Sequence, residues 1–219
     1  MLFMPMIYSQ SPDLNDWANL QRFDAPNATL GEPSPGEKRI VFMGNSITEG
    51  WPHAAPEFWN NPERINRGIS GQTTPQMLVR FRPDVIDLKP YAVFILAGTN
   101  DIAGNTGPMT HDMITDNIAS MADLAPAHGI KVVLCSVLPA YDYAWRPGLE
   151  PAPKIVALNA WMKQYAAEKG MIYLDYHSAM KDGKDGLLEE YTYDGVHCTK
   201  EGYAVMSKLA SELIASISE

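Results

Sequence analysis

The segment Val41-Phe42-Met43-Gly44-Asn45-Ser46-Ile47-Thr48-Glu49-Gly50-Trp51 begins as an apolar run and changes abruptly to glycine and small polar residues. Such a run is typical of a buried strand, and Gly, Asn and Ser are residues with which a chain leaves a strand. Open α/β sheets bind ligands beyond the carboxyl ends of their strands. Ser46 is therefore either a turn residue or a candidate nucleophile, and the rest of the sequence decides between these interpretations.

Four more apolar runs follow, separated by helical patterns. The run 91–97 is apolar on both faces, as expected of a central parallel strand, whereas 64–69 is less apolar and is predicted at a sheet edge. The predicted strands are 40–43, 64–69, 91–97, 132–138 and 171–174. The alternation of strands and helices predicts an α/β fold, a three-layer α/β/α sandwich with a flavodoxin-like five-stranded parallel sheet in the order 2-1-3-4-5.

The spacing of apolar residues predicts the helices. A short helix is expected over 54–60, and a longer one after Thr74, which is predicted as its N-cap with Pro75 in the first position. Pro83 is expected to restart that helix. The other helical patterns are 16–23, 114–125, 155–165 and 203–217, the last capped by Thr199.

The composition of the 219-residue chain, with 46% hydrophobic and 20% charged residues, fits one globular domain. We expect this domain over 38–219, after an N-terminal arm over 1–37. A formal net charge of −9 argues against a nucleic-acid partner, because such binding needs clustered Lys and Arg. Cys135 and Cys198 form no disulfide framework, and no Cys/His spacing predicts a metal site.

The first ten residues are apolar but short. They are interpreted as an arm packed on the domain, or as the remnant of a secretory signal whose start lies upstream. The signal remnant suggests a periplasmic or secreted protein, and otherwise the protein is expected in the cytoplasm. No later stretch approaches about eighteen uninterrupted apolar residues, so no integral membrane segment is expected. The sequence predicts no particular oligomeric state.

Residues that can assist Ser46 follow other predicted strands. Gly71 and Asn100 follow the second and third strands and so lie on the same edge of the sheet. Singly they are ordinary turn residues, but with the N–H of Ser46 they can donate hydrogen bonds to an oxyanion. Asp194 precedes His197 by three residues, so its carboxylate can accept the Nδ1 proton and leave Nε2 to take a proton from Ser46. Together these residues predict a nucleophile, a base, an orienting acid and an oxyanion hole.

Four motif blocks carry these residues. They are Gly44-Asn45-Ser46-Ile47-Thr48, Gly68-Ile69-Ser70-Gly71, Gly98-Thr99-Asn100-Asp101 and Asp194-Gly195-Val196-His197. In this order they resemble the blocks of the SGNH or GDSL hydrolases, and the resemblance runs from about Lys38 to the C-terminus. It implies a serine esterase with Ser46 as nucleophile, His197 as base and Asp194 as its partner. It also implies Gly71 and Asn100 as oxyanion donors, and hydrolysis without a metal or organic cofactor.

The first block departs from the usual family pattern, because Asn45 stands where Asp is common. A neutral amide can still form local hydrogen bonds, so the loop is expected to survive without the electrostatic contribution of a carboxylate. The α/β-hydrolase elbow Gly-x-Ser-x-Gly is not satisfied, since Thr48 occupies the position of its second glycine.

Aromatic residues near these blocks are candidates for substrate binding. Tyr141, Tyr143, Trp145 and Arg146 follow the fourth strand, and Trp51 follows the first motif. Such side chains either offer flat faces to a sugar or pack their loops onto the domain. The resemblance favours a small acyl group, foremost an acetyl group removed from a carbohydrate or another small ester. A lysophospholipid or a thioester remains an alternative substrate.

Two further classes of function remain open. The stretch 70–74 at a helix start can cradle a phosphate, as in a flavin-binding protein, although neither Gly-x-x-x-x-Gly-Lys-[Ser/Thr] nor Gly-x-Gly-x-x-Gly occurs. A catalytically silent carbohydrate-binding relative is the other class, and the complete set of site residues argues against it. Cys198, beside His197, is expected to be a packing residue and not a competing nucleophile.

Overall fold

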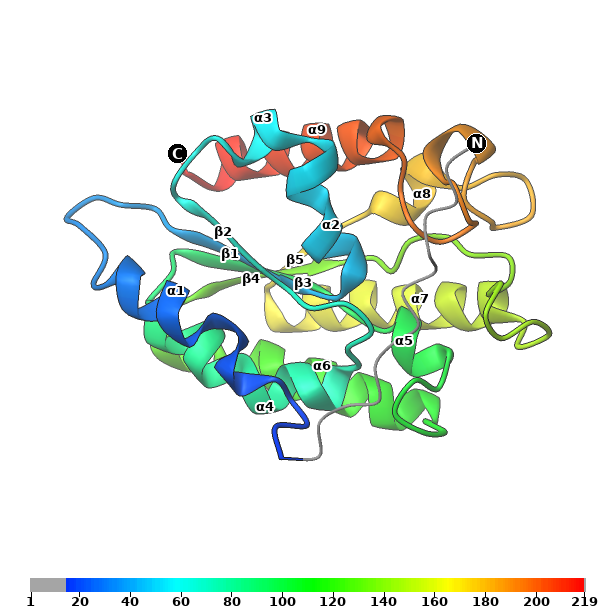
Figure 1. Cartoon of the computed structure of the whole chain (residues 1–219), viewed down its shortest axis with the longest axis horizontal. Helices are drawn as coiled ribbons and strands as arrows, with labels where there is room; N and C mark the ends of the chain where they lie inside the picture. Colours follow the sequence, from blue (N-terminus) through cyan, green and yellow to red (C-terminus); the bar gives the residue numbers. More distant parts are fainter. Residues whose placement is uncertain (1–14, 219) are drawn as a thin grey trace.

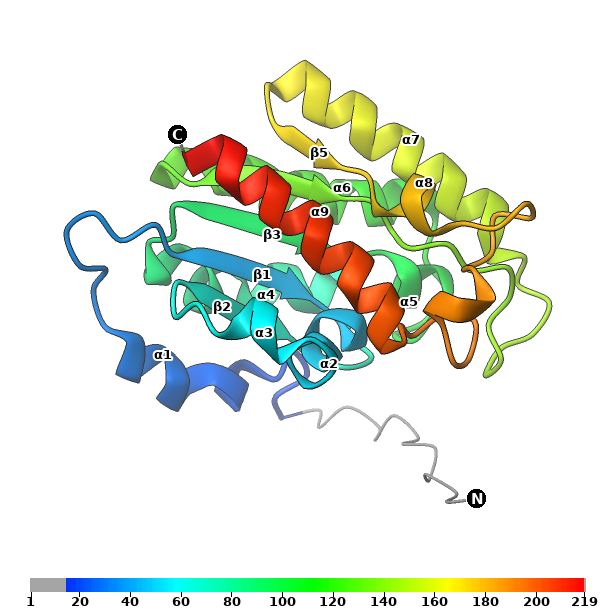
Figure 2. The same cartoon turned by 90° about the horizontal axis from the view of Figure 1, so that it is seen from above.

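A five-stranded parallel sheet forms the centre of the computed structural model, which describes residues 15–218. The strand order is β2-β1-β3-β4-β5 (Figures 1 and 2). The strands are β1 Ile40–Gly44, β2 Arg64–Gly68, β3 Ala92–Leu96, β4 Lys131–Cys135 and β5 Ile172–Leu174. The predicted fold class and strand order are confirmed, and β2 is an edge strand, as its lower apolar content predicted.

Helices cover both faces of this sheet (Figure 1). One face packs against α4, α6 and α7, and the other against α2, α3, α8 and α9. The helices are α1 Asp24–Leu30, α2 Ser46–Ala54, α3 Pro56–Trp59, α4 Thr74–Asp84, α5 Thr99–Ile102, α6 His111–Leu124, α7 Pro151–Lys169, α8 Tyr176–Met180 and α9 Lys200–Ser218. Short 3₁₀ turns are η1 Leu20–Phe23, η2 Ile86–Leu88, η3 Pro126–His128 and η4 Glu189–Tyr191. The arrangement is the predicted three-layer sandwich.

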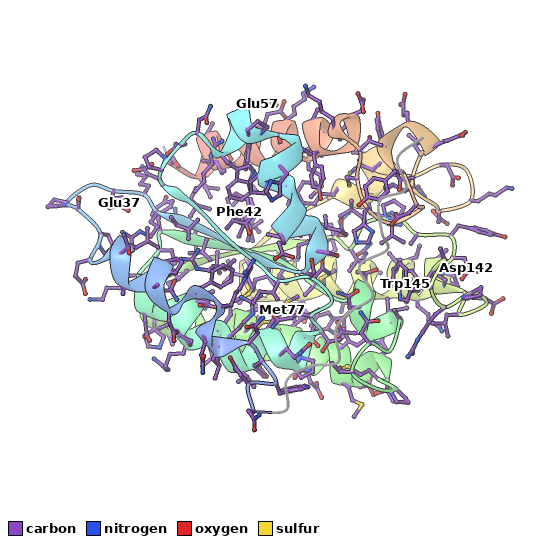
Figure 3. All side chains as sticks on the ribbon, viewed as in Figure 1. Glu37, Phe42, Glu57, Met77, Asp142 and Trp145 are labelled. Carbon is purple, nitrogen blue, oxygen red and sulfur yellow. The ribbon has the colours of Figure 1, made fainter. Side chains whose placement is uncertain are left out.

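Each central strand contributes to both apolar layers, because successive side chains point to opposite faces of a sheet. In β1, Val41 and Met43 join the core beneath α4, α6 and α7, whereas Phe42 joins the core beneath α2 and α9. Figure 3 shows Phe42 and Met77 of α4 on opposite sides of the sheet. Burial on both faces explains why the central strands read as continuous apolar runs.

Helix α2 begins at Ser46, directly after β1, whereas the sequence predicted a helix only from Ala54. Asn45 is its N-cap, and its Oδ1 accepts the N–H of Ile47 at 3.0 Å. A cap of this kind satisfies an N–H group that has no partner within the helix. The amide therefore does form the local hydrogen bond expected of it.

Pro52 lies inside α2 and lacks the N–H that would bond the carbonyl of Thr48. That carbonyl accepts Nδ2 of Asn66 on β2 instead, at 2.6 Å. The proline is therefore tolerated, and the bond it cannot make is replaced by one that joins α2 to the edge strand.

Helix α4 has Thr73 as its N-cap, so the prediction of Thr74 is wrong by one residue. Oε1 of Gln76 accepts the N–H of Thr73 at 3.1 Å, and the two residues form a capping box. Pro83 lies in the last turn of α4, and the helix ends one residue later. Pro83 therefore does not restart the helix as predicted, and the 3₁₀ turn η2 follows.

The described part of the predicted arm is bonded to the rest of the fold. In place of the helix predicted over 16–23, only η1 forms there, and α1 follows it. Nε2 of Gln72, on the loop before α4, donates to the carbonyl of Ala18 at 2.8 Å. The boundary between arm and domain at residue 37 stays a prediction.

The predictions for the first ten residues, including the signal remnant, lie outside the described residues. Across residues 15–218, the helices are too short or too polar to cross a membrane. Cys135 and Cys198 are both free and buried.

Candidate active site

Ser46 is the first residue of α2, just beyond the carboxyl end of β1. The turn into the helix is tight at Gly44, where a Cβ would lie 2.0 Å from Oγ1 of Thr48. The first N–H groups of a helix have no partner within it and form the positive end of its dipole. The N–H of Ser46 can therefore bind a negatively charged oxygen.

A hydrogen-bonded chain joins Ser46 to His197 and Asp194. Oγ of Ser46 lies 2.9 Å from Nε2 of His197, although 151 residues separate the two in sequence. Nδ1 of His197 lies 2.6 Å from Oδ2 of Asp194, and Oδ1 of the same carboxylate accepts the N–H of His197 at 2.7 Å. The carboxylate favours the proton on Nδ1, which leaves Nε2 to accept the hydroxyl of Ser46.

The loop between η4 and α9 holds Asp194 and His197 as one unit. Oγ1 of Thr192 accepts the N–H of Gly195 at 2.9 Å and donates to the carbonyl of His197 at 2.8 Å. Gly195 has a φ of 87°, a conformation that glycine adopts without steric cost. Oγ1 of Thr199 then accepts the N–H of the third residue of α9 at 3.2 Å, which is the predicted cap.

The pKa of Asp194 is lower than usual, although only about a third of the side chain is exposed. Burial raises the pKa, but hydrogen bonds from the ring and the backbone N–H of His197, together with one from Val196, outweigh that effect. The carboxylate is therefore charged at neutral pH and can stabilise a positive charge on His197.

Gly71 lies on the loop before α4, and hydrogen bonds join this loop to Asn100 of α5 and to Asn105. Nδ2 of Asn100 donates to the carbonyl of Gln72 at 2.9 Å, and Nδ2 of Asn105 donates to the carbonyl of Gly71 at 3.2 Å. Gly71 has a φ of 77° and open space where a Cβ would stand. An incoming molecule can approach the backbone of Gly71 closely, while its oxyanion role stays a prediction.

Asp101, next to Asn100, ties α5 to the start of α4. Its Oδ1 accepts the N–H of Thr74 at 2.8 Å and the hydroxyl of Thr74 at 2.6 Å. Its Oδ2 is buried without a hydrogen-bond partner among residues 15–218. Burial raises the pKa of Asp101 to about 6, against the hydrogen bonds from Thr74, which lower it.

Arg80 is buried beneath these loops, and sequence reasoning did not single it out. Its Nε donates to Oε1 of Gln72 at 2.5 Å, and its Nη2 donates to the carbonyls of Gly44 and Arg67 at 3.1 and 2.9 Å. Nη1 forms an ion pair with Asp84 at 3.0 Å. One side chain thus joins the ends of β1 and β2 to the loop that follows Gly71.

The sequence does contain a pattern that indicates a structural role for Arg80. It lies three residues after Met77 and beside Phe81, on the face of α4 that is fully buried. A charge on an apolar helix face needs buried hydrogen-bond partners, so its position indicates a structural network.

Glu49 connects α2 to the loop before Gly71. Its Oε2 accepts the N–H of Ser70 at 2.9 Å and also the hydroxyl of Ser70. Its Oε1 pairs with Arg22 at 3.1 Å. Because Ser70 directly precedes Gly71, this contact links the helix that carries Ser46 to the second loop of the site.

Two candidate substrate-binding residues, Trp51 and Tyr143, are core residues, which corrects the prediction. Trp51 is 1% exposed and stacks on Phe58 with ring centroids 4.9 Å apart. It follows Ile47 by one helical turn and so shares the buried face of α2. Tyr143 is fully buried, with its hydroxyl 2.8 Å from Oγ1 of Thr99.

The loop between β4 and α7 is anchored by Arg146. Its Nη1 donates to the carbonyls of Ala103 and Gly104, at 2.8 and 3.1 Å. Tyr141 on the same loop is 64% exposed. The geometry gives Arg146 a role in holding the loop, and substrate contact by Arg146 or Tyr141 stays a prediction.

Two other aromatic rings lie against His197. The ring centroids of Trp145 and the imidazole are 6.4 Å apart, and those of Tyr193 and the imidazole are 5.9 Å apart. Figure 3 shows Trp145 and Asp142 at the same end of the molecule as α5. Sequence reasoning did not single out Tyr193, although its position beside Asp194 was an available signal.

Cys198 faces away from the site into the core. Its Sγ lies 3.9 Å from Sδ of Met206, and burial raises its pKa to about 12. The prediction that it is a packing residue is confirmed.

The N–H groups at the start of α4 are occupied by the protein itself. Those of Thr73 and Thr74 donate to Gln76 and Asp101. This observation argues against the phosphate cradle considered for residues 70–74. Within residues 15–218, no cluster of three or more His, Cys, Asp or Glu side chains could hold a metal ion.

The sequence matches the GDSL-like Lipase/Acylhydrolase family over residues 42–205. It is 50% identical to a candidate acylhydrolase from Bacteroides fragilis NCTC 9343, with a TM-score of 0.90 over 93% of this chain and 99% of that chain. It is 48% identical to a GDSL-like lipase from Bacteroides thetaiotaomicron VPI-5482, with a TM-score of 0.88 over 91% of this chain and 98% of that chain.

A curated relative is the uncharacterised lipoprotein YqeF of Bacillus subtilis (strain 168). It is 32% identical over 131 residues, which make up 52% of this chain. The match covers 54% of that protein, so the chain spans about half the length of this curated relative.

Proposed function

The chain belongs to the GDSL-like lipase/acylhydrolase family, and from this premise we propose that it is a serine esterase acting through an acyl-enzyme. The observation that carries the proposal is the chain of contacts from Ser46 through His197 to Asp194, at 2.9 and 2.6 Å. In this proposal Ser46 is the nucleophile, His197 the general base and Asp194 the group that orients His197.

The reaction proceeds in two acyl-transfer steps. Oγ of Ser46 attacks the ester carbonyl carbon while Nε2 of His197 takes its proton. The ester C–O bond then breaks, and His197 gives that proton to the departing alcohol oxygen. Water attacks the acyl group on Ser46 with His197 again as base, and the acid leaves as Ser46 regains its proton. Serine, histidine and water account for every proton, so no cofactor forms part of the proposal.

Three donors are proposed for the oxyanion that forms during attack. The N–H of Ser46 lies at the N-terminus of α2, and the N–H of Gly71 belongs to a residue without a side chain. Nδ2 of Asn100 has a second hydrogen beyond the one it donates to Gln72. Donors of this kind stabilise the transition state more than the ester itself.

The proposed substrate is an acetylated carbohydrate or another ester of a small acyl group. The loop that carries Tyr141 and Trp145 brings exposed aromatic surface to the region of His197. The net charge of −9 disfavours an anionic lysophospholipid. Lysophospholipase and thioesterase activity are the alternative outcomes of the test below.

An exported location, periplasmic or secreted, is part of the proposal. It is supported by the curated relative from Bacillus subtilis, which is described as a lipoprotein. Fractionation of the source cells with an antibody against the protein tests it, and recovery from the cytoplasm alone would contradict it.

The decisive experiment measures hydrolysis of p-nitrophenyl esters of increasing acyl length, followed by release of acetate from acetylated oligosaccharides. We expect acetyl esters to be preferred and Ser46→Ala to abolish turnover, because the nucleophile is lost. Unchanged activity in Ser46→Ala would exclude the proposed mechanism. A preference for acyl chains longer than about eight carbons would instead indicate a lipase-like pocket, since each buried methylene adds binding energy.

A further inference from the structure

Two exposed aromatic rings lie against the imidazole of His197. Tyr193 is 72% exposed, and its ring is nearly parallel to the imidazole, at an angle of 13°. The ring of Trp145 is 42% exposed and tilted by 38°. The acyl-transfer steps use neither ring. Large aromatic faces left in water beside a catalytic base are surface available to a substrate.

Buried neighbours hold Trp145 in place. Its ring stacks on that of Tyr143, with centroids 4.9 Å apart, and Tyr143 bonds Thr99 on α5. Arg146, the next residue, donates to two carbonyls at the end of α5. Because α5 also carries Asn100, Trp145 keeps a fixed position relative to the site.

Tyr193 belongs to the same loop unit as the acid–base pair. Its N–H donates to the carbonyl of His197 at 3.3 Å, and Asp194 follows it directly. The backbone of Tyr193 is therefore fixed to that of His197, and its ring stacks beside the imidazole without taking part in the hydrogen bonds that orient it.

The chemistry of acyl transfer decides which part of an ester meets these rings. His197 must return a proton to the alcohol oxygen, so in the productive complex that oxygen lies within hydrogen-bond distance of Nε2. The carbonyl oxygen faces the oxyanion donors instead. Groups that pack against the imidazole of His197 therefore line the alcohol side of the site.

Building on the esterase function proposed above, we propose that Tyr193 and Trp145 form the subsite for the alcohol part of the ester, and that this alcohol is a neutral pyranose. A pyranose presents an apolar C–H face to an aromatic ring and hydroxyl groups at its edge, where the tyrosine hydroxyl can bond. The net charge of −9 and the carboxylate of Asp194 disfavour a phosphate-bearing alcohol.

The test compares two acetate esters that differ in the alcohol, an acetylated methyl glucopyranoside and ethyl acetate. Tyr193→Ala and Trp145→Ala are each expected to lower kcat/KM for the sugar ester about tenfold, mainly through KM, because one stacking face is lost. Ethyl acetate is expected to stay within about twofold of wild type, since it does not reach the rings. Tyr193→Phe keeps the ring and should retain most of the activity on the sugar ester.

Tyr165→Ala on α7 is the matched control. This tyrosine stacks on Trp161 and bonds Asp123, and it lies near the end of α7 that leads into β5, away from the carboxyl edge of the sheet. Both esters should be hydrolysed by this variant as by wild type.

An equal loss on both esters with a shifted pH profile would assign Tyr193 to positioning His197 and overturn the subsite. Unchanged kcat/KM for the sugar ester in both alanine variants would overturn it as well. If the alanine variants lose more kcat/KM on acetylcholine than on the sugar ester, the subsite binds a cationic alcohol and not a pyranose. Ser46→Ala, assayed in parallel, keeps the proposals distinguishable, because its activity tests the esterase itself.

Discussion

Asn100 has both a proposed catalytic role and a structural hydrogen bond. One hydrogen of its Nδ2 is donated to the carbonyl of Gln72, and the proposed oxyanion role uses the other. We expect Asn100→Ala to lower kcat by about 10² to 10³, with a small change in KM, because the bond forms mainly in the transition state. Steady-state kinetics on p-nitrophenyl acetate measures this.

Asn100→Asp supplies the control, since it keeps the shape but removes the donor and adds a negative charge. Its kcat should fall at least as far as that of the alanine variant. A loss smaller than about threefold in both variants would exclude Asn100 from the oxyanion hole.

Asp101 makes the stability of the protein depend on pH. Its pKa is about 6 in the folded protein against an ordinary value of 3.8. Between these pH values Asp101 is protonated in the folded protein and charged in the unfolded chain. The free energy of unfolding should therefore fall by about 2 kcal/mol between pH 4 and pH 7 through this group alone. Asp101→Asn should lack this decline, as measured by urea unfolding at several pH values.

Asp123→Asn, which changes a carboxylate on the exposed side of α6, is the control and should follow wild type. Parallel pH dependence in Asp101→Asn and wild type would contradict the burial argument. The contribution of Asp194 to stability depends on pH in the opposite direction. Because its pKa is lowered in the folded protein, it adds stability above pH 3.8, and this stability is lost on acidification.

At the scale of the element, α2 depends on its cap. Asn45→Ala removes the acceptor for the N–H of Ile47 and should lower the free energy of unfolding by about 1 kcal/mol. Asn45→Asp keeps an acceptor and places a negative charge at the N-terminus of the helix, which is favourable. Its stability should equal or exceed that of wild type in thermal unfolding, and a loss as large as that of the alanine variant would refute this account of the cap.

The same helix shows where sequence reasoning stops. The strand before it was predictable from its apolar run, but a helix was predicted only from Ala54, whereas α2 begins at Ser46. Without the helix, the four-residue spacing of Ile47 and Trp51 did not indicate a shared buried face, and Trp51 was predicted as a possible substrate-binding residue. Which face an aromatic side chain occupies follows from the phase of its element, so an error in the element became an error in the site.

At the scale of the whole molecule, the position of the site was predictable because parallel strands end at one edge of a sheet. Ser46, Gly71 and Asn100 each follow a different strand and needed only the strand order to be placed on that edge. The long loop between β4 and α7 has no such periodicity. The contacts of Trp145 and Tyr193 with His197 depend on tertiary packing and could not be derived from the sequence.

The anchor made by Arg146 has a consequence for how this enzyme can diversify. Its guanidinium bonds only the main-chain carbonyls of Ala103 and Gly104, so the attachment uses no side chain of α5. The residues displayed on the loop, such as Tyr141 and Trp145, can be exchanged without detaching it from α5. A lineage, or a protein engineer, can therefore change the exposed side chains of this loop while the frame that carries Asn100 stays where it is.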